Sequence, residues 1–295
     1  MPVVSAARYG KDNVRVYKVH KDEASGIHTV TEMTVCCLLE GAIETSYTVA
    51  DNSVVVATDS IKNTIYIKAK EHPVNPPELY ASILGQHFLD TYAHINVANV
   101  NIVVKRWTRM VIDGKEHPHS FYRDGEETRN VEARITRQGI EITSGIAGLL
   151  VLKSTGSAFH GFVRDEFTTL QETWDRILST DVDANWKWNT LPNVAAVEKQ
   201  VAQFDKAWED ARKITMKTFA EEDSPSVQNT MYKMSEQILD AAPETTSVTY
   251  ALPNKHYFEV DLSWHKGVKN TGKDAEVYAP QTNPNGLIKV EVSRS

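Results

Sequence analysis

Apolar and polar residues alternate over much of the first half of the chain, which is the pattern of half-buried β-strands. Residues 14–20 (VRVYKVH) and 28–39 (HTVTEMTVCCLL) alternate in this way. The polar segment between them ends in Gly26, so the two runs predict a β-hairpin. Residues 44–56 have a composition typical of strands, and we expect the strand pattern to continue there.

The spacing then changes to one that is typical of helices. The polar residues 58–60 resemble a helix N-cap, and isoleucines spaced four residues apart follow them. Residues 76–78 (PPE) open a second amphipathic helix. Alternating β-branched residues return over 98–110, and a further strand is predicted near 119–123.

The second half of the chain repeats this order. Strand patterns occupy residues 131–142, 149–153, part of 175–188, 246–262 and 287–292. The strongest helical spacing lies over residues 194–222, and a Ser-Pro pair separates it from a second helix over 226–241. The repeated order of strands, two helices and strands predicts two similar units, residues 1–138 and 139–295.

Composition narrows the class of protein. The 295 residues carry a formal net charge of −7, with 41% hydrophobic and 24% charged residues. These fractions are typical of a folded globular protein. An acidic balance argues against a nucleic-acid partner, which usually meets a basic surplus. No apolar run approaches the roughly 20 residues of a membrane-spanning helix, so no membrane partner is expected.

The two cysteines, Cys36 and Cys37, are neighbours in a strand pattern. Adjacent strand residues point to opposite faces of a sheet, so the two thiols are poorly placed to form a disulfide. The N-terminus lacks the apolar segment of a secretory signal. We therefore expect an intracellular, reducing location.

The sequence contains partial matches to metal-binding and nucleotide-binding motifs, but each match lacks a required residue. Residues 267–273 match most of a P-loop, but Asp274 stands where a Ser or Thr should bind magnesium, and no helix pattern follows. His117 and His119 offer two imidazoles, but no nearby cysteine or acidic pair completes a ligand set. A Gly-x-Ser-x-Gly motif for serine hydrolysis is missing too. We expect no metal site.

Several separated segments resemble the signature motifs of one enzyme family. They are Tyr9-Gly10-Lys11, VVATDSIKN (55–63), Phe159 in SAFHGFVRDEFTTL, Arg176 in ETWDRILSTDVDA, Val227-Gln228 in SVQNTMYKM, and LPNKHYF (252–258). Together they resemble urate oxidase (uricase), and several longer sequence segments are most similar to the fungal enzymes. The resemblance extends nearly from end to end of the chain, with the motifs in the family's order and spacing.

The resemblance implies an α+β architecture, the tunnelling fold (T-fold), with two tandem units of antiparallel sheet and helices. It also implies a homotetrameric barrel with active sites at subunit interfaces. One subunit would supply Lys11, Thr58 and Asp59, and its neighbour the remaining residues. The family is usually peroxisomal, but this chain ends in Ser-Arg-Ser rather than a Ser-Lys-Leu-type address, so a cytoplasmic location is the alternative.

The reaction implied by the resemblance belongs to purine catabolism. Urate, O2 and water give 5-hydroxyisourate and H2O2, without a metal, flavin or other cofactor. Lys11, Thr58 and His256 resemble the family's proton relay, in which a lysine amine acts as base and a histidine titrates near neutral pH. Asn254 resembles the residue that holds O2, peroxide or the attacking water.

The substrate-binding residues implied by the resemblance suit a flat purine anion. Arg176 has a planar fork of donors for one edge of the ring, and Gln228 has both a donor and an acceptor for another. Phe159 can stack on the ring face. Backbone N–H groups of Thr58-Asp59 and of Val227 can satisfy ring acceptors at helix N-termini.

Taken singly, each of these residues also has an ordinary structural interpretation. Thr58 alone is a helix cap, and Arg176 beside Asp175 could form a surface ion pair. The function also has alternatives: another purine- or pterin-binding enzyme of the same fold, or a barrel that binds urate without turnover. The Lys11, Thr58 and His256 set favours urate oxidation over both.

Overall fold

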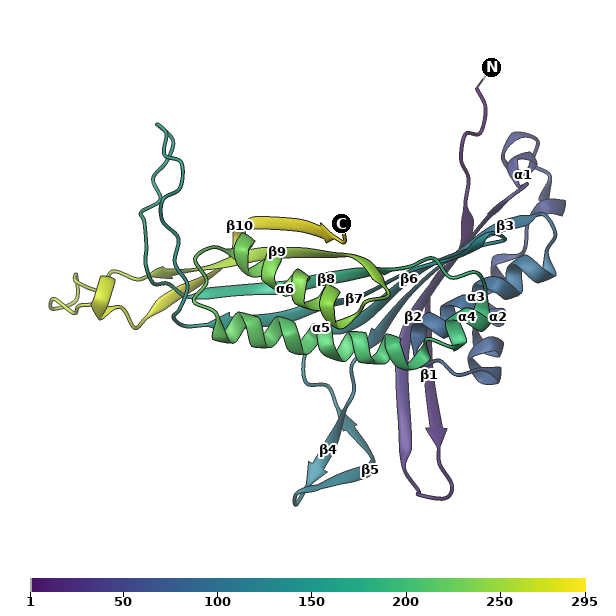
Figure 1. Ribbon diagram of the computed structural model, residues 1–295, viewed down its shortest axis with the longest axis horizontal. Helices are drawn as coiled ribbons and strands as arrows, with labels where there is room; N and C mark the ends of the chain where they lie inside the picture. The colour runs from purple at the N-terminus through teal and green to yellow at the C-terminus, as the bar shows by residue number, and fades with distance from the viewer. Residues whose placement is uncertain (1) are drawn as a thin grey trace.

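Within the described residues 2–295 of the computed structural model, one antiparallel sheet of eight strands forms the centre of the molecule (Figure 1). The strand order is β1-β2-β3-β6-β7-β8-β9-β10. The strands are β1 (Tyr9–Lys21), β2 (His28–Gly41), β3 (Ile95–Lys105), β6 (Thr128–Thr136), β7 (Gly139–Lys153), β8 (Leu178–Trp188), β9 (Thr245–Glu259) and β10 (Tyr278–Ser293). A separate hairpin of β4 (Thr108–Ile112) and β5 (Lys115–Tyr122) projects from the sheet.

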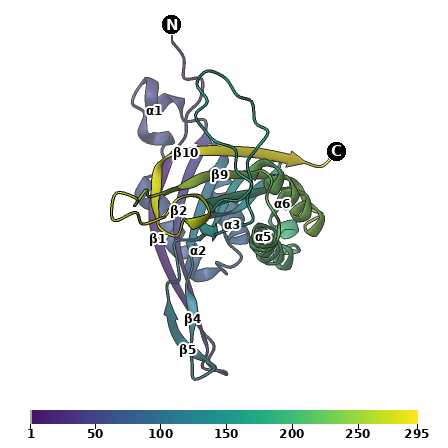
Figure 2. The same ribbon diagram turned by 90° about the vertical axis from the view of Figure 1, so that its left-hand side faces the viewer.

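The longer helices pack against one face of the sheet (Figure 2). They are α2 (Thr58–Glu71) on β1, α3 (Pro77–Thr91) on β3 and β6, α5 (Val201–Glu221) on β7, and α6 (Val227–Ala241) on β9 and β10. The short helices are α1 (Glu44–Thr48), α4 (Val194–Glu198) and the 3-10 turns η1 (Asn52–Val54) and η2 (Gly272–Asp274). No helix in residues 2–295 is long and apolar enough to cross a membrane.

Strand alternation explains which face of the sheet the helices cover. Every second residue of β2 is buried, including Met33, Val35, Cys37 and Leu39. These side chains point toward the helices, and the residues between them, which are only partly buried, lie on the opposite face. Cys36 and Cys37 therefore face opposite ways, and both are free thiols, as the sequence predicted.

The expected fold class is confirmed. Each half contains antiparallel strands and two long helices: α2 and α3 in the first half, α5 and α6 in the second. The predicted boundary at residue 138 falls in the turn between β6 and β7, and these strands pair directly across it. Because one sheet continues through both halves, the division into units 1–138 and 139–295 stays a prediction.

Three local predictions were wrong. Residues 44–56 form α1 and η1 instead of a strand, because the chain leaves the sheet after Gly41 and has no partner strand there. The helix expected over 194–222 is interrupted near Lys199 and Gln200, which separate α4 from α5. Thr58 lies inside α2, whose N-cap is Ala57, so Thr58 is not a cap.

A buried ion pair connects the helices of the two halves. The Glu78 carboxylate on α3 is fully buried. It accepts hydrogen bonds from Arg129 on β6 at 2.8 Å and from the Ser144 hydroxyl on β7 at 2.6 Å. Arg129 also donates to Asp205 on α5 at 2.6 Å. Buried charges need such partners, so this network fixes α3 relative to α5.

Candidate active site

Lys11, Thr58 and Asp59 form the first group of predicted site residues, on β1 and α2. Lys11 pairs with Cys37 across the β1–β2 ladder, and Cys37 is fully buried against the helices. Residues directly opposite each other in an antiparallel pair share a face. Lys11 therefore points to the side of the sheet where α2 packs.

A β-bulge puts Lys11 on that face. The register shifts by one residue between Lys11 and Val14, so that Asp12 and Asn13 together oppose Cys36. Val14 is buried against the helices, and in a regular strand Lys11 would then face the other way. Asn13 makes the bulge possible, because its φ of 56° lies in the left-handed region that asparagine tolerates.

The N-terminus of α2 leaves its first N–H groups open. The first intrahelical bond runs from Ile61 N–H to the Ala57 carbonyl, and among the described residues no side chain caps this helix. The N–H groups of residues 58–60 thus point outward from the helix end, as the binding role predicted for Thr58 and Asp59 requires.

The Asp59 carboxylate turns back onto its own helix. It accepts a hydrogen bond from Lys62 at 2.6 Å and another from Asn63 at 3.0 Å. The hydrogen bond and charge of Lys62 lower the pKa of Asp59, and the positive charge of Lys11 adds to this effect. The charges of Lys62 and Lys11 thus both favour the ionised form of the Asp59 carboxylate.

Arg176 and Phe159 form the centre of the second group. The Arg176 guanidinium lies over the Phe159 ring, 5.1 Å from its centroid, and Phe162 stacks on the same ring. Burial lowers the pKa of Arg176, but guanidinium groups remain charged in proteins. The Arg176 Nε is buried and has no hydrogen-bond partner within residues 2–295.

The ion pair considered for Arg176 does not form in the described chain. The Asp175 carboxylate instead accepts hydrogen bonds from the Thr155 hydroxyl at 2.8 Å and the Gly156 N–H at 2.9 Å. These bonds hold the loop that precedes Phe159, so Asp175 supports the geometry of the loop and leaves the guanidinium free for another anion.

Backbone hydrogen bonds connect this loop to the start of α6. Phe159 pairs with Thr173, and the Ala158 N–H donates to the Ser224 carbonyl. Ser226 then caps α6 by accepting the Asn229 N–H. Val227 and Gln228 follow directly, the first buried and the second exposed, with N–H groups in the open first turn.

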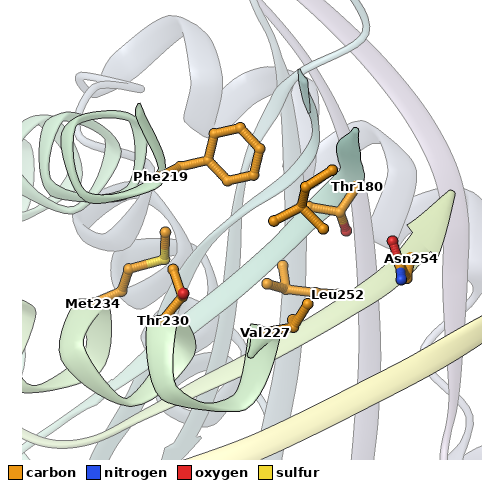
Figure 3. A pocket seen from close by; sticks show the side chains of 8 residues that line it. Thr180, Phe219, Val227, Thr230, Met234, Leu252 and Asn254 are labelled. Atoms are coloured by element: carbon orange, nitrogen blue, oxygen red, sulfur yellow. The ribbon is translucent and has the colours of Figure 1, made fainter. Parts of the chain in front are cut away.

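Asn254 and His256 lie on β9. They are two residues apart, so their side chains share a face of the strand. Asn254 pairs with Thr180 on β8, and a small apolar cavity lies between the two strands and α6 (Figure 3). Asn254 and Val227 both line this cavity, which places the start of α6 beside β9.

The fold keeps the two groups apart. The first lies on β1, at one edge of the sheet, and on α2; the second lies around β9, next to the other edge strand β10 (Figure 1). One chain thus brings Phe159, Arg176, Val227, Gln228, Asn254 and His256 into one region and Lys11, Thr58 and Asp59 into another. The roles assigned to these residues stay predictions.

Sequence reasoning missed residues that hold the site. The bulge at Asp12 and Asn13 has a visible signal, because the alternation of YGKDNVRVY changes phase at this pair. The contact of Ser224 with Ala158 has no such signal, because it joins residues far apart in the chain.

In residues 2–295, no group of three or more His, Cys, Asp or Glu side chains could hold a metal ion. The rings of His117 and His119 lie 4.6 Å apart and stack edge to face.

The fold and the site together define a class of protein: a tunnelling-fold chain with one antiparallel sheet covered by helices, and with an arginine over an aromatic ring, suited to a flat anion. The model of the family described as uricase matches residues 7–134 and 142–289. The chain belongs to the uricase family.

Individual relatives agree with this assignment. A uricase from Emericella nidulans is 68% identical over 100% of this chain and 98% of its own length, and a uricase from Aspergillus flavus is 66% identical over the same shares. The crystal structure of uricase from Arthrobacter globiformis is 37% identical, with a TM-score of 0.88, covering 100% of this chain and 96% of that one.

Proposed function

We propose that this chain is a urate oxidase, which oxidises urate with O2 and water to 5-hydroxyisourate and H2O2. Beyond family membership, the main structural support is the Arg176 guanidinium 5.1 Å from the centroid of the Phe159 ring, on the loop that is hydrogen-bonded to the segment preceding α6. A planar donor fork next to an aromatic face suits a flat anion such as urate.

Four residues of the second group would bind the ring. Arg176 donates to one edge of urate, and the Gln228 amide pairs with another. Phe159 stacks on the ring, and the Val227 N–H at the start of α6 satisfies a ring acceptor. The apolar surroundings of Val227 exclude water from this end of the site and strengthen the polar contacts.

The remaining residues would move protons and place the oxidant. In the overall reaction the ring loses two electrons to O2, which takes up two protons to become H2O2, and water supplies the new hydroxyl group. Lys11, Thr58 and His256 form the relay that accepts and returns the protons. Asn254, beside His256 on β9, holds O2 or the attacking water over the ring.

The separation of the two groups supports an oligomeric enzyme. We propose that Lys11, Thr58 and Asp59 of one subunit complete a site with the second group of a neighbouring subunit, in a homotetrameric barrel. Closed, symmetric assemblies repeat such a shared site at every equivalent interface.

A direct assay tests the activity. The purified assembly is incubated with urate in air while the loss of urate absorbance and the appearance of peroxide are followed. We expect both at matching rates. A folded assembly that produces no peroxide would refute urate oxidation and leave binding without turnover.

A complementation experiment tests the shared site. Lys11→Met and Arg176→Ala chains, each expected to be inactive alone, are co-expressed and purified together. Random assembly pairs an intact first group with an intact second group in about a quarter of the sites, so roughly that share of the activity returns. No recovery in proven mixed assemblies would place each site within a single chain.

A further inference from the structure

Tyr9 forms a hydrogen bond that connects the two elements of the first group. Its hydroxyl accepts the Val56 N–H at 2.6 Å, across 47 residues of sequence. We propose that Tyr9 is a positioning residue for the reaction, which fixes the start of α2, and with it Thr58, relative to Lys11. This inference rests on the proposed function.

On the β1 side, Tyr9 and Lys11 form a rigid unit. They are two residues apart, before the bulge, and pair with the fully buried Leu39 and Cys37. Both side chains therefore face α2. Gly10 lies between them, where a Cβ would come within 1.9 Å of the Cys37 carbonyl oxygen. This close approach leaves β1 little room to shift on β2.

On the α2 side, the hydrogen bond lies close to the reacting residue. Val56 is buried, and only Ala57 separates it from Thr58. Before Val56, the Val55 N–H donates to the Asn52 carbonyl within the η1 turn, and the Val54 carbonyl oxygen lies 2.9 Å from His94 Nε2. The extended segment between η1 and α2 thus has few other connections to the sheet, and Tyr9 supplies the one nearest Thr58.

The chemistry of the phenol fits this role. Tyr9 is half-buried and packs against the core. Burial raises the pKa of Tyr9, although the hydrogen bond from Val56 acts in the other direction. The buried hydroxyl therefore holds its proton more tightly than an exposed phenol does, and its oxygen can accept the Val56 N–H.

The test removes only the hydroxyl. In the assembled enzyme, Tyr9→Phe is expected to lower kcat about tenfold to a hundredfold, since small misplacements of reacting groups cost that much. KM should change less than kcat, because the side chains expected to hold the urate ring, those of Arg176, Gln228 and Phe159, lie in the second group. Tyr66→Phe is the matched control: Tyr66 also connects α2 to β1, by a 3.2 Å bond to the Arg15 carbonyl, but lies away from Thr58. Its kcat should match that of the wild type.

A double-mutant cycle separates positioning from simple stability. If Tyr9 acts through Thr58, Tyr9→Phe should lower kcat little further in a Thr58→Ala background. A full additional loss in that background would overturn the inference, and so would Tyr9→Phe with the kcat of Tyr66→Phe. A wild-type enzyme that does not oxidise urate refutes the proposed function instead.

One measurement needs no variant and covers the case in which Tyr9→Phe does not fold. Hydrogen exchange at the Val56 amide of the wild-type assembly should be slow compared with the same amide in an unstructured peptide of this sequence. Equal exchange rates would show that the bond from Val56 to Tyr9 is not maintained, and would refute the proposal.

Discussion

The bulge at Asn13 gives a prediction that joins backbone geometry to turnover. Asn13 has a φ of 56°, where a β-branched residue is strained. Placing an L-residue with a branched Cβ there costs about 1–2 kcal/mol, whereas glycine avoids that penalty. The lost side-chain contact, from Asn13 Nδ2 to Asp12 Oδ2 at 2.9 Å, is exposed and is the same in both variants. Asn13→Val should therefore be less stable than Asn13→Gly by about 1–2 kcal/mol.

The substitution at Asn13 should also change the face of the sheet to which Lys11 points. The chain can relieve the strain in Asn13→Val by losing the bulge, which turns Lys11 to the opposite face of the sheet. We expect Asn13→Val to lose most of its kcat for urate, and Asn13→Gly to keep most of it.

Thermal unfolding measures the difference in stability between the two Asn13 variants, and urate oxidation at saturating urate measures their kcat. For a chain of 295 residues, 1 kcal/mol corresponds to roughly 1.5–2 °C in Tm. The reasoning is refuted if Asn13→Val melts and turns over like Asn13→Gly, since the left-handed backbone would then not determine the direction of Lys11.

Further predictions concern the relay, the binding residues and the core. Lys11→Met and Thr58→Ala should each slow turnover far more than they weaken urate binding; weak binding with normal turnover would move them to the binding set. Arg176→Lys should raise KM about tenfold or more, because a bidentate contact is lost, while Arg164→Lys, on the same loop, should not; equal effects would contradict the special role. Glu78→Gln should destabilise the fold by about 3–5 kcal/mol in unfolding experiments, and an unchanged Tm would show that the buried pair is dispensable. A chelator should leave the rate of peroxide formation unchanged; inhibition would argue for a metal.

The long elements of the fold were predictable because local periodicity reports burial. The alternation of residues 28–39 predicted β2, and the spacing of Ile61 and Ile65 predicted α2, both of which the structure contains. The prediction for 44–56 failed because strand composition needs a neighbouring strand, and the chain has left the sheet there. The N-cap prediction failed by one residue, which is within the usual uncertainty of helix ends.

The candidate site was predictable only as a set of residues. Short motifs pointed to Arg176, Phe159 and Val227, and the structure brings their segments together through backbone pairing with Thr173 and Ser224. Nothing in the local pattern indicates those pairings, because they join residues that are distant in the chain.

The sequence by itself determined the order of strands and helices, the repeat of that order and the residues that resemble uricase motifs. These features depend on neighbours along the chain, through side-chain periodicity and backbone preference. Only the tertiary structure decided the face to which Lys11 points, the contact of Tyr9 with Val56 and the separation of the two groups toward opposite edges of the sheet. These three features depend on strand register and on contacts between residues distant in the chain. A shift of one residue in strand pairing reverses the face of every side chain that follows.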